Sequence, residues 1–223
     1  IDTIFFGYGN PATSALSSNF SATGLHAEMP HYPANGDIAA ANKMLDDAGY
    51  KKDGDGVRLK GTLDLIPYGE DWRRAGEYLK QALGDIGIQL ELRYEDVPTW
   101  LKRVYHRYDF QMNVNYFYQL PDPVLGVHRH YGTDQIRKGT HFVNSSRYSN
   151  PKLDALLDAG AGEPDAAKRT AAYKEIQQIL ADDMPVVNLF ELEFLVVYNT
   201  KLKGAYGSAM GAYGSFREAY LDD

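Results

Sequence analysis

The residues best suited to ligand chemistry lie at the end of a predicted strand, in the segment 113–123. Tyr116 and Tyr118 are two positions apart and would project to the same side, and Gln119 follows them. A tyrosine ring offers stacking area and a hydroxyl, while a glutamine amide offers both a donor and an acceptor. Because α/β proteins bind ligands beyond the carboxyl ends of their strands, this pattern predicts a site for a neutral polar molecule. Packing in the core or at a sheet edge is the alternative for each tyrosine.

Three further residues complete the predicted ligand-binding set. Tyr68 follows another predicted strand, and Asn144 and Arg147 lie in the segment that leads into a later helix. Tyr68 would add a third ring to the site, provided that the two strand ends are neighbours. A surface salt bridge is the alternative role for Arg147.

Other polar motifs indicate structure rather than chemistry. His128, His130 and the nearby His141 could suggest a metal site, but residues two apart on a helix do not face each other. We interpret them as surface histidines, and we predict no metal site and no cofactor. The run 53–56 predicts a tight turn, because no calcium-ligand pattern continues after it. The run 7–12 predicts a helix stop, because a dinucleotide fingerprint would need a third glycine.

No catalytic constellation is evident. A glycosidase needs two carboxylates that converge on one cleft, whereas the acidic pairs 46–47 and 182–183 lie at predicted helix ends beside solvent-facing positions. The chain has no nucleophile elbow, P-loop or zinc-protease motif. We therefore predict that the chain is not an enzyme. A hydrolase with clustered cleft carboxylates is the alternative, and a purely structural or adaptor domain is a third possibility.

Composition narrows the class of partner. The net charge of −7 and the lack of a basic cluster argue against nucleic acid, whose binding needs lysine and arginine. With no cysteine among 223 residues, disulfides and thiolate chemistry are excluded. The 17 tyrosines raise the aromatic share to 13%, which is typical of proteins that line a ligand cleft with rings.

Hydrophobic periodicity predicts an α/β fold. Helical spacing and capping residues predict helices that alternate with strands of period two. The expected helices are 37–48, 70–86, 98–107, 150–159 and 164–183, with the last turns of another at 1–8. The expected strands are 62–67, 88–95, 110–115, 186–190 and 194–199. We expect one mixed sheet of about five strands flanked by helices.

A series of motifs in a fixed order resembles a known family. They are GYGNPA (7–12), LDDAGY with the turn and DGVR that follow (45–58), the helix–strand unit 77–92, Asp122-Pro123, NSSRYSNP through Leu157 (144–157), and the helix 168–183 with Met184-Pro185. The series is similar to that of the bacterial extracellular solute-binding proteins of family 5, the oligopeptide-, dipeptide- and nickel-binding components of ABC importers.

This resemblance implies a two-lobed periplasmic-binding-protein fold of type II (cluster C-like) that closes on its ligand like a flytrap. The chain resembles only the second lobe, residues 1–204, and residues 205–223 would return to the missing first lobe. The implied partners are a small-molecule solute and the permease subunits of the importer. The implied location is the periplasm, or a lipid anchor outside the cytoplasm.

The resemblance also bears on the solute. Peptide-binding members hold the peptide ammonium with an aspartate where this chain has Gln119, and dipeptide binders hold the carboxylate with a basic residue where it has Ile66. Without both ionic anchors, a dipeptide would lose charge-assisted hydrogen bonds of roughly 1.5–3 kcal/mol each. We therefore expect an oligosaccharide-like or oligopeptide solute rather than a free dipeptide.

Overall fold

A three-stranded parallel sheet lies at the centre of the computed structural model, which describes residues 1–29, 36–207 and 210–222. The strands are β2 (Leu59–Leu65), β3 (Ile88–Arg93) and β4 (Met112–Val114), in the order β3-β2-β4. β3 pairs with residues Leu59 to Asp64 of β2, and β4 pairs with the last three residues of β2. Because all three strands run in the same direction, the chain leaves β2 and β4 at the same edge of the sheet.

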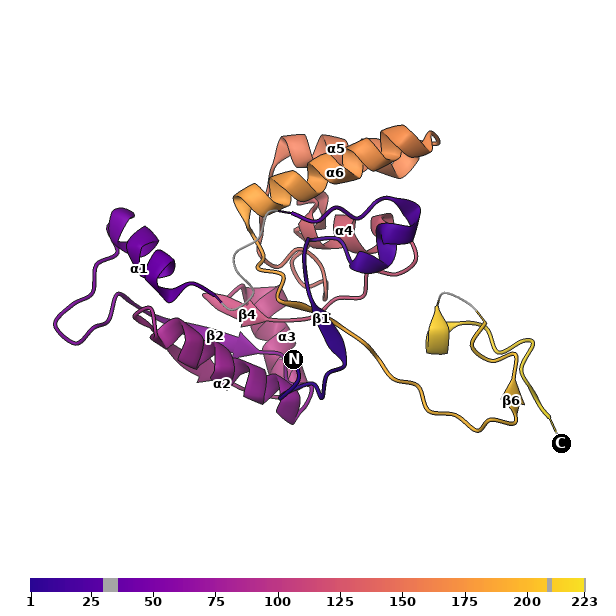
Figure 1. Cartoon of the computed structure of the whole chain (residues 1–223), viewed down its shortest axis with the longest axis horizontal. Helices are drawn as coiled ribbons and strands as arrows, with labels where there is room; N and C mark the ends of the chain where they lie inside the picture. The colour runs from indigo at the N-terminus through magenta and orange to yellow at the C-terminus, as the bar shows by residue number, and fades with distance from the viewer. Residues whose placement is uncertain (30–35, 208–209, 223) are drawn as a thin grey trace.

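Helix α2 (Glu70–Gly84) connects β2 to β3 and packs on the sheet (Figure 1). Its apolar stripe buries Trp72 and Ala75, as the helical spacing predicts. A Cβ atom at Gly76 would lie 2.4 Å from a methyl carbon of Leu65, so this glycine lets the helix approach β2 closely. The same core receives side chains from α3 (Val97–Leu101) and from the π-helical turn η2 (Lys102–Arg107).

A second core is built from helices. Figure 1 shows α5 (Pro151–Gly162) and α6 (Ala166–Asp183) side by side above α4 (Pro123–Tyr131). The segment with the 3-10 turn η1 (Ser18–Thr23) packs against these helices, and another 3-10 turn, η3 (Thr133–Gln135), follows α4. The buried side chains of this core include Leu16, Phe20, Val127, Leu153, Tyr173 and Ile176.

Short antiparallel pairs complete the described fold. β1 (Gly9–Pro11) pairs with β5 (Phe190–Leu192), which brings the start of the chain beside the segment that follows α6. Beyond β5 the chain runs away from both cores to a small sheet of β6 (Leu202–Lys203) and β7 (Tyr220–Leu221), with the 3-10 turn η4 (Gly211–Tyr213) between them (Figure 1).

The motif at residues 45–58 (LDDAGY, the turn and DGVR) connects helix and sheet through side-chain hydrogen bonds. Helix α1 (Ile38–Asp47) buries none of its side chains fully, yet Arg58, just before β2, holds its end in place. The Arg58 guanidinium donates to Asp46 at 2.5 Å, to Asn42 Oδ1 at 2.9 Å and to the Tyr50 carbonyl, and its Nε donates to another backbone carbonyl. The motif therefore joins α1 to the sheet.

The structure confirms the α/β class with a small sheet flanked by helices, but it corrects the expected single sheet of about five strands. Within the described residues, the strands form three separate sheets. The segment 186–199 does not join the central sheet, because its one strand, β5, pairs with β1. Residues 1–8 form turns instead of the expected end of a helix. No helix among the described residues is both long and apolar enough to span a bilayer.

Candidate functional site

Six aromatic side chains form a continuous strip at the edge of the central sheet where β2 and β4 end. This aromatic strip consists of Tyr68, Trp72, Tyr116, Tyr118, Phe194 and Tyr213. Tyr116 lies at its centre: its ring centroid is 5.4 Å from that of Trp72, 5.8 Å from Tyr68 and 5.6 Å from Tyr118. The sequence prediction that these three tyrosines lie together agrees with this geometry.

The strip has a buried base and an exposed rim. Trp72 is only 7% exposed and stacks against Tyr116 at an interplanar angle of 17°. Tyr68, Tyr118 and Phe194 are all at least two-fifths exposed. Phe194 packs 5.4 Å from the Tyr118 ring, measured between centroids. An exposed run of rings on a rigid base is suited to stacking against a flat, weakly polar molecule.

The hydroxyls of Tyr68 and Tyr118 carry no charge near neutral pH. Burial, followed by the neighbouring Tyr116, raises the pKa of Tyr68 above its ordinary value. Burial and hydrogen bonding to Tyr213 and Tyr116 raise the pKa of Tyr118 further. The hydroxyls of Tyr118 and Tyr213 are 3.4 Å apart. These groups therefore offer neutral hydrogen bonds.

Gln119 lies next to the strip, but its amide is already used within the chain. Its Oε1 accepts from the Ser17 backbone N–H at 2.7 Å, and its Nε2 donates to the Ala15 carbonyl at 2.7 Å. Glu191 holds the same loop, accepting from the Ser18 backbone at 2.9 Å. Gln119 thus anchors the loop that precedes η1 to the end of β4.

Asn144 and Arg147 do not join the strip. Asn144 is 1% exposed, and its Nδ2 donates to the carbonyls of Gly132 and Tyr148 at 3.1 and 2.9 Å. Its contacts are those of a buried structural asparagine. Arg147 is exposed, and its guanidinium lies 5.1 Å from the ring centroid of Tyr108, which precedes β4. The structure thus gives Arg147 a contact with an aromatic ring instead of the salt bridge considered as its alternative role.

The histidines do not form the surface group that the sequence suggests. His130 is buried, with its ring centroid 3.6 Å from that of Phe117, and burial lowers its pKa to about 3. His128 is partly buried near Tyr173, and burial lowers its pKa as well. Helix α4 turns both rings toward packed side chains, which is why the surface interpretation is wrong for them. His141 instead lies beside His106.

The acidic pairs named for a hydrolase do not converge on the strip. Asp46 pairs with Arg58 and Asp47 with Lys43 at the end of α1. At the end of α6, Asp182 accepts from Gln178 and Asp183 accepts from Tyr148 and Asn150. The buried Asp64 on β2 is 2.6 Å from Arg93 and 3.4 Å from Arg103. Each carboxylate has its own local partner.

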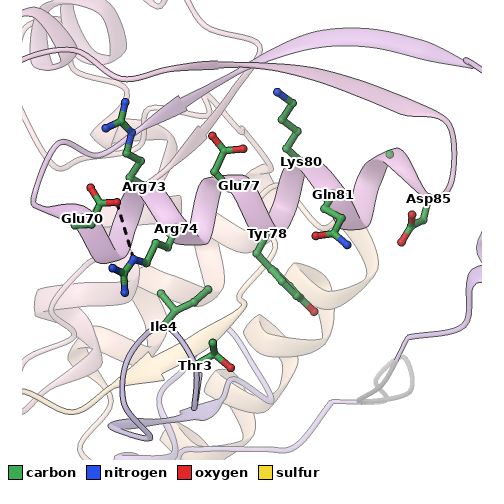
Figure 2. Close-up of a pocket in the computed structure, with 11 residues that line it drawn as sticks. Thr3, Ile4, Glu70, Arg73, Arg74, Glu77, Tyr78, Lys80, Gln81 and Asp85 are labelled. Atoms are coloured by element: carbon green, nitrogen blue, oxygen red, sulfur yellow. Dashed lines mark ion pairs between the residues drawn. The ribbon is translucent and has the colours of Figure 1, made fainter.

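An open groove lies elsewhere, along α2. Figure 2 shows its lining, in which Arg74 and Tyr78 extend from the helix on the side where Thr3 and Ile4 lie. Its volume is about 1150 Å³, and its charged side chains include the Glu70–Arg74 pair at 3.9 Å. The groove is open, and both acidic and basic side chains line it. It shares no residue with the aromatic strip.

Sequence reasoning missed three members of the strip. Trp72 was assigned to the helix stripe, which is correct but incomplete, because its ring also supports Tyr116. Phe194 was placed in a strand and Tyr213 in an irregular tail. No local pattern marks them, since both reach the strip from segments that follow α6 and β6.

Comparison with known proteins identifies the family. The model of the bacterial extracellular solute-binding proteins, family 5 Middle, matches residues 1–137. Protein XP55 of Streptomyces lividans is 28% identical over 208 residues, which cover 92% of this chain and 37% of that protein.

Solved structures share the fold. The periplasmic binding protein DppA of Helicobacter pylori in complex with the peptide STSA has a TM-score of 0.76 at 20% identity, over 100% of this chain and 41% of that one. A mannohexaose-bound periplasmic oligopeptide-binding protein of Thermotoga maritima has a TM-score of 0.68 at 22% identity, over 85% and 38%. The chain thus spans less than half of each protein's length. Its fold is that of the type II periplasmic binding proteins. It belongs to the bacterial extracellular solute-binding proteins of family 5.

Proposed function

We propose that this chain is the second lobe of the substrate-binding component of an ABC importer, and that the aromatic strip is its ligand surface. The single observation that carries this proposal is the position of the strip. Exposed, uncharged rings gather beyond the carboxyl ends of two parallel strands, where α/β folds bind ligands. Within this family, such a surface would cover a solute from one side while another lobe covers it from the other.

The chemistry of the strip favours an oligosaccharide-like or oligopeptide solute. No charged side chain belongs to it, so it offers ring faces and hydroxyls rather than an ion pair. Ile66 is fully buried in the core, and the Gln119 amide is satisfied by backbone groups, so neither supplies a charged anchor. The structural neighbours named above hold a four-residue peptide in one case and mannohexaose in the other. A free dipeptide needs ionic anchors, which the six side chains of the strip do not provide.

Residues 205–223 are proposed to pack against the first lobe. Apolar side chains in and just before this segment are strongly exposed: Leu195, Val197, Tyr213, Phe216, Tyr220 and Leu221. Exposed apolar surface of this extent is typical of an interface. The first lobe, the permease subunits and a solute are therefore the proposed partners, and the proposed location is the periplasm or the outer face of the cytoplasmic membrane.

A thermal-shift screen of the full-length protein tests the ligand class. The ligands are neutral oligosaccharides, oligopeptides and simple dipeptides. A ligand at 100 times its dissociation constant should add about 2.7 kcal/mol to the free energy of unfolding. We expect stabilisation by a long neutral ligand and little by dipeptides. Strong stabilisation by dipeptides alone would contradict the proposed ligand class, and turnover of any stabilising ligand would favour the hydrolase alternative.

A further inference from the structure

Two histidines far apart in the sequence meet at the surface, away from the aromatic strip. His106 lies in the last turn of the π-helical segment η2, and His141 lies in the loop that follows η3. Their Nε2 atoms are 3.1 Å apart and their ring centroids 5.3 Å apart. At this distance one Nε2–H can donate a hydrogen bond to the other Nε2, and the tautomers decide which ring is the donor.

The backbone around both rings is held in place. The Gly139 N–H donates to the Tyr105 carbonyl at 2.8 Å, which fixes the loop of His141 against η2. Arg129 donates to the His141 carbonyl at 3.2 Å, and the Tyr105 ring lies 5.9 Å from the His141 ring. The side-chain pair itself is exposed. The backbone therefore holds the two ring nitrogens close to each other at the surface.

We propose that His106 and His141 form a two-imidazole binding site for a transition-metal ion. Metal–nitrogen bonds of about 2.0–2.1 Å that join nitrogens 3.1 Å apart subtend roughly 100° at the ion. This angle lies between the octahedral and tetrahedral values. The metal would take the place of the bridging hydrogen, and each ring would turn by roughly 40° to aim its nitrogen at the ion.

The surroundings select the kind of ion. The described residues contain no group of three or more histidine, cysteine and acidic side chains that could hold a metal, so water or a small anion completes the coordination. Within the described residues no carboxylate joins the pair, which argues against hard ions because these bind oxygen ligands. Imidazole suits Cu²⁺, Ni²⁺ and Zn²⁺, and the general order of affinity places Cu²⁺ first.

Calorimetric titration of the tag-free, full-length protein with Cu²⁺ and with Ni²⁺ tests the site. We expect saturable binding of one ion, tighter for Cu²⁺, and its loss in both His106→Gln and His141→Gln. The control is His26→Gln, which removes a histidine whose ring contacts Thr13 and the Leu16 carbonyl instead. Binding that persists in His106→Gln, or that is absent from the unsubstituted protein, would overturn the proposal.

Tryptophan fluorescence gives a second measurement that does not depend on titrating a weakened variant. In a Trp72→Phe background, Trp100 is the remaining tryptophan of these 223 residues. Its ring lies 5.9 Å from Tyr105, which in turn contacts His141. Cu²⁺ at the pair should quench this emission with the same saturation curve, and a chelator should restore it. Quenching that is absent, or that His141→Gln leaves unchanged, would place the ion elsewhere and overturn the site.

Discussion

The two sides of the segment after β4 have different roles: one belongs to the proposed ligand surface, and the other attaches the segment to the helical core. On one side, Tyr116 and Tyr118 face the aromatic strip, and Tyr118 is 42% exposed. On the other side, Phe117 packs against the buried His130, and Gln119 binds the loop before η1. The extended backbone alternates between them. One strand end can therefore carry a ligand surface because its opposite side is fixed to the helical core.

The fixed side depends on close backbone packing. A Cβ atom at Gly126 would lie 2.6 Å from the Gln119 Cα, so the glycine allows α4 to rest directly on this segment. The exposed side has no such constraint at its rim. The comparison indicates that substitutions on the anchored side should act first on stability, and those on the strip rim should act first on binding.

Trp72→Ala should have the largest effect, because this ring belongs to both the core and the strip. Truncating a buried tryptophan costs about 3–5 kcal/mol through lost burial and the cavity that remains. Tyr116 would also lose its stacking partner, so ligand affinity should fall together with stability. Urea unfolding and a binding titration measure the two effects. Trp72→Phe is the control and should recover most of both; loss of stability without loss of affinity would separate the strip from its base.

Acidification should lower the free energy of unfolding, because His130 is buried against Phe117 on the anchored side of the segment after β4. The pKa of His130 is lowered to about 3 by burial, from an ordinary value of 6.5. Between these values the unfolded chain binds a proton that the folded chain does not, so stability falls as pH falls through 6.5. The slope from this group is at most about 1.4 kcal/mol per pH unit. His128, whose pKa is lowered for the same reason, adds to the loss in the same direction.

Urea unfolding at neutral and mildly acidic pH measures this slope. In His130→Leu, the difference between the two conditions should be smaller than in the unsubstituted protein, whatever the substitution does to stability at neutral pH. An equal difference in both proteins would show that His130 does not remain neutral in the fold.

The sequence predicted most of the local elements, and three rings of the aromatic strip (Tyr68, Tyr116 and Tyr118), because these follow from short-range patterns. The β3 alternation, the α2 stripe and the Asp122 cap all appear as expected, with Asp122 accepting from the Val124 N–H at 2.9 Å. Tyr68 and Tyr116 could be placed together because parallel strands end at one edge.

What the sequence could not show depends on contacts between distant segments. Nothing near Gln119 in the sequence indicates that its amide is already hydrogen-bonded, because its partners are more than one hundred residues away along the chain. The motif at residues 45–58 gives no sign of the contacts by which Arg58 holds Asp46 and Asn42 of α1. The pairing of β5 with β1, which removes it from the central sheet, likewise has no local signal.

Gln119→Ala should show a moderate loss of stability. The change leaves the Ser17 N–H and the Ala15 carbonyl without their partner in a half-buried place, which costs about 1–3 kcal/mol. Gln111→Ala is a matched control, because Gln111 also accepts from a backbone N–H, that of Thr62, but at an exposed position. Denaturant unfolding should show the larger loss for Gln119→Ala. An equal loss in both variants would argue against an anchoring role.

Tyr118→Ala should have the smallest effect on stability and a clear effect on binding. Its ring is on the exposed rim, so the free energy of unfolding should change by no more than about 0.5 kcal/mol. Loss of one stacked ring should weaken ligand binding about tenfold, which corresponds to about 1.4 kcal/mol. Tyr118→Phe keeps the ring and loses only the hydroxyl near Tyr213, so it should bind almost as well.

Tyr78→Ala provides the matched control for Tyr118→Ala, because Tyr78 is 64% exposed on α2 and lies outside the strip. A binding titration with the ligand found in the thermal-shift screen compares the three variants. If Tyr78→Ala weakens binding as much as Tyr118→Ala, the ligand lies in the groove along α2 and not on the strip (Figure 2). If Tyr118→Phe loses as much as Tyr118→Ala, the hydroxyl matters more than the ring, and the ligand is held by polar contacts instead of stacking.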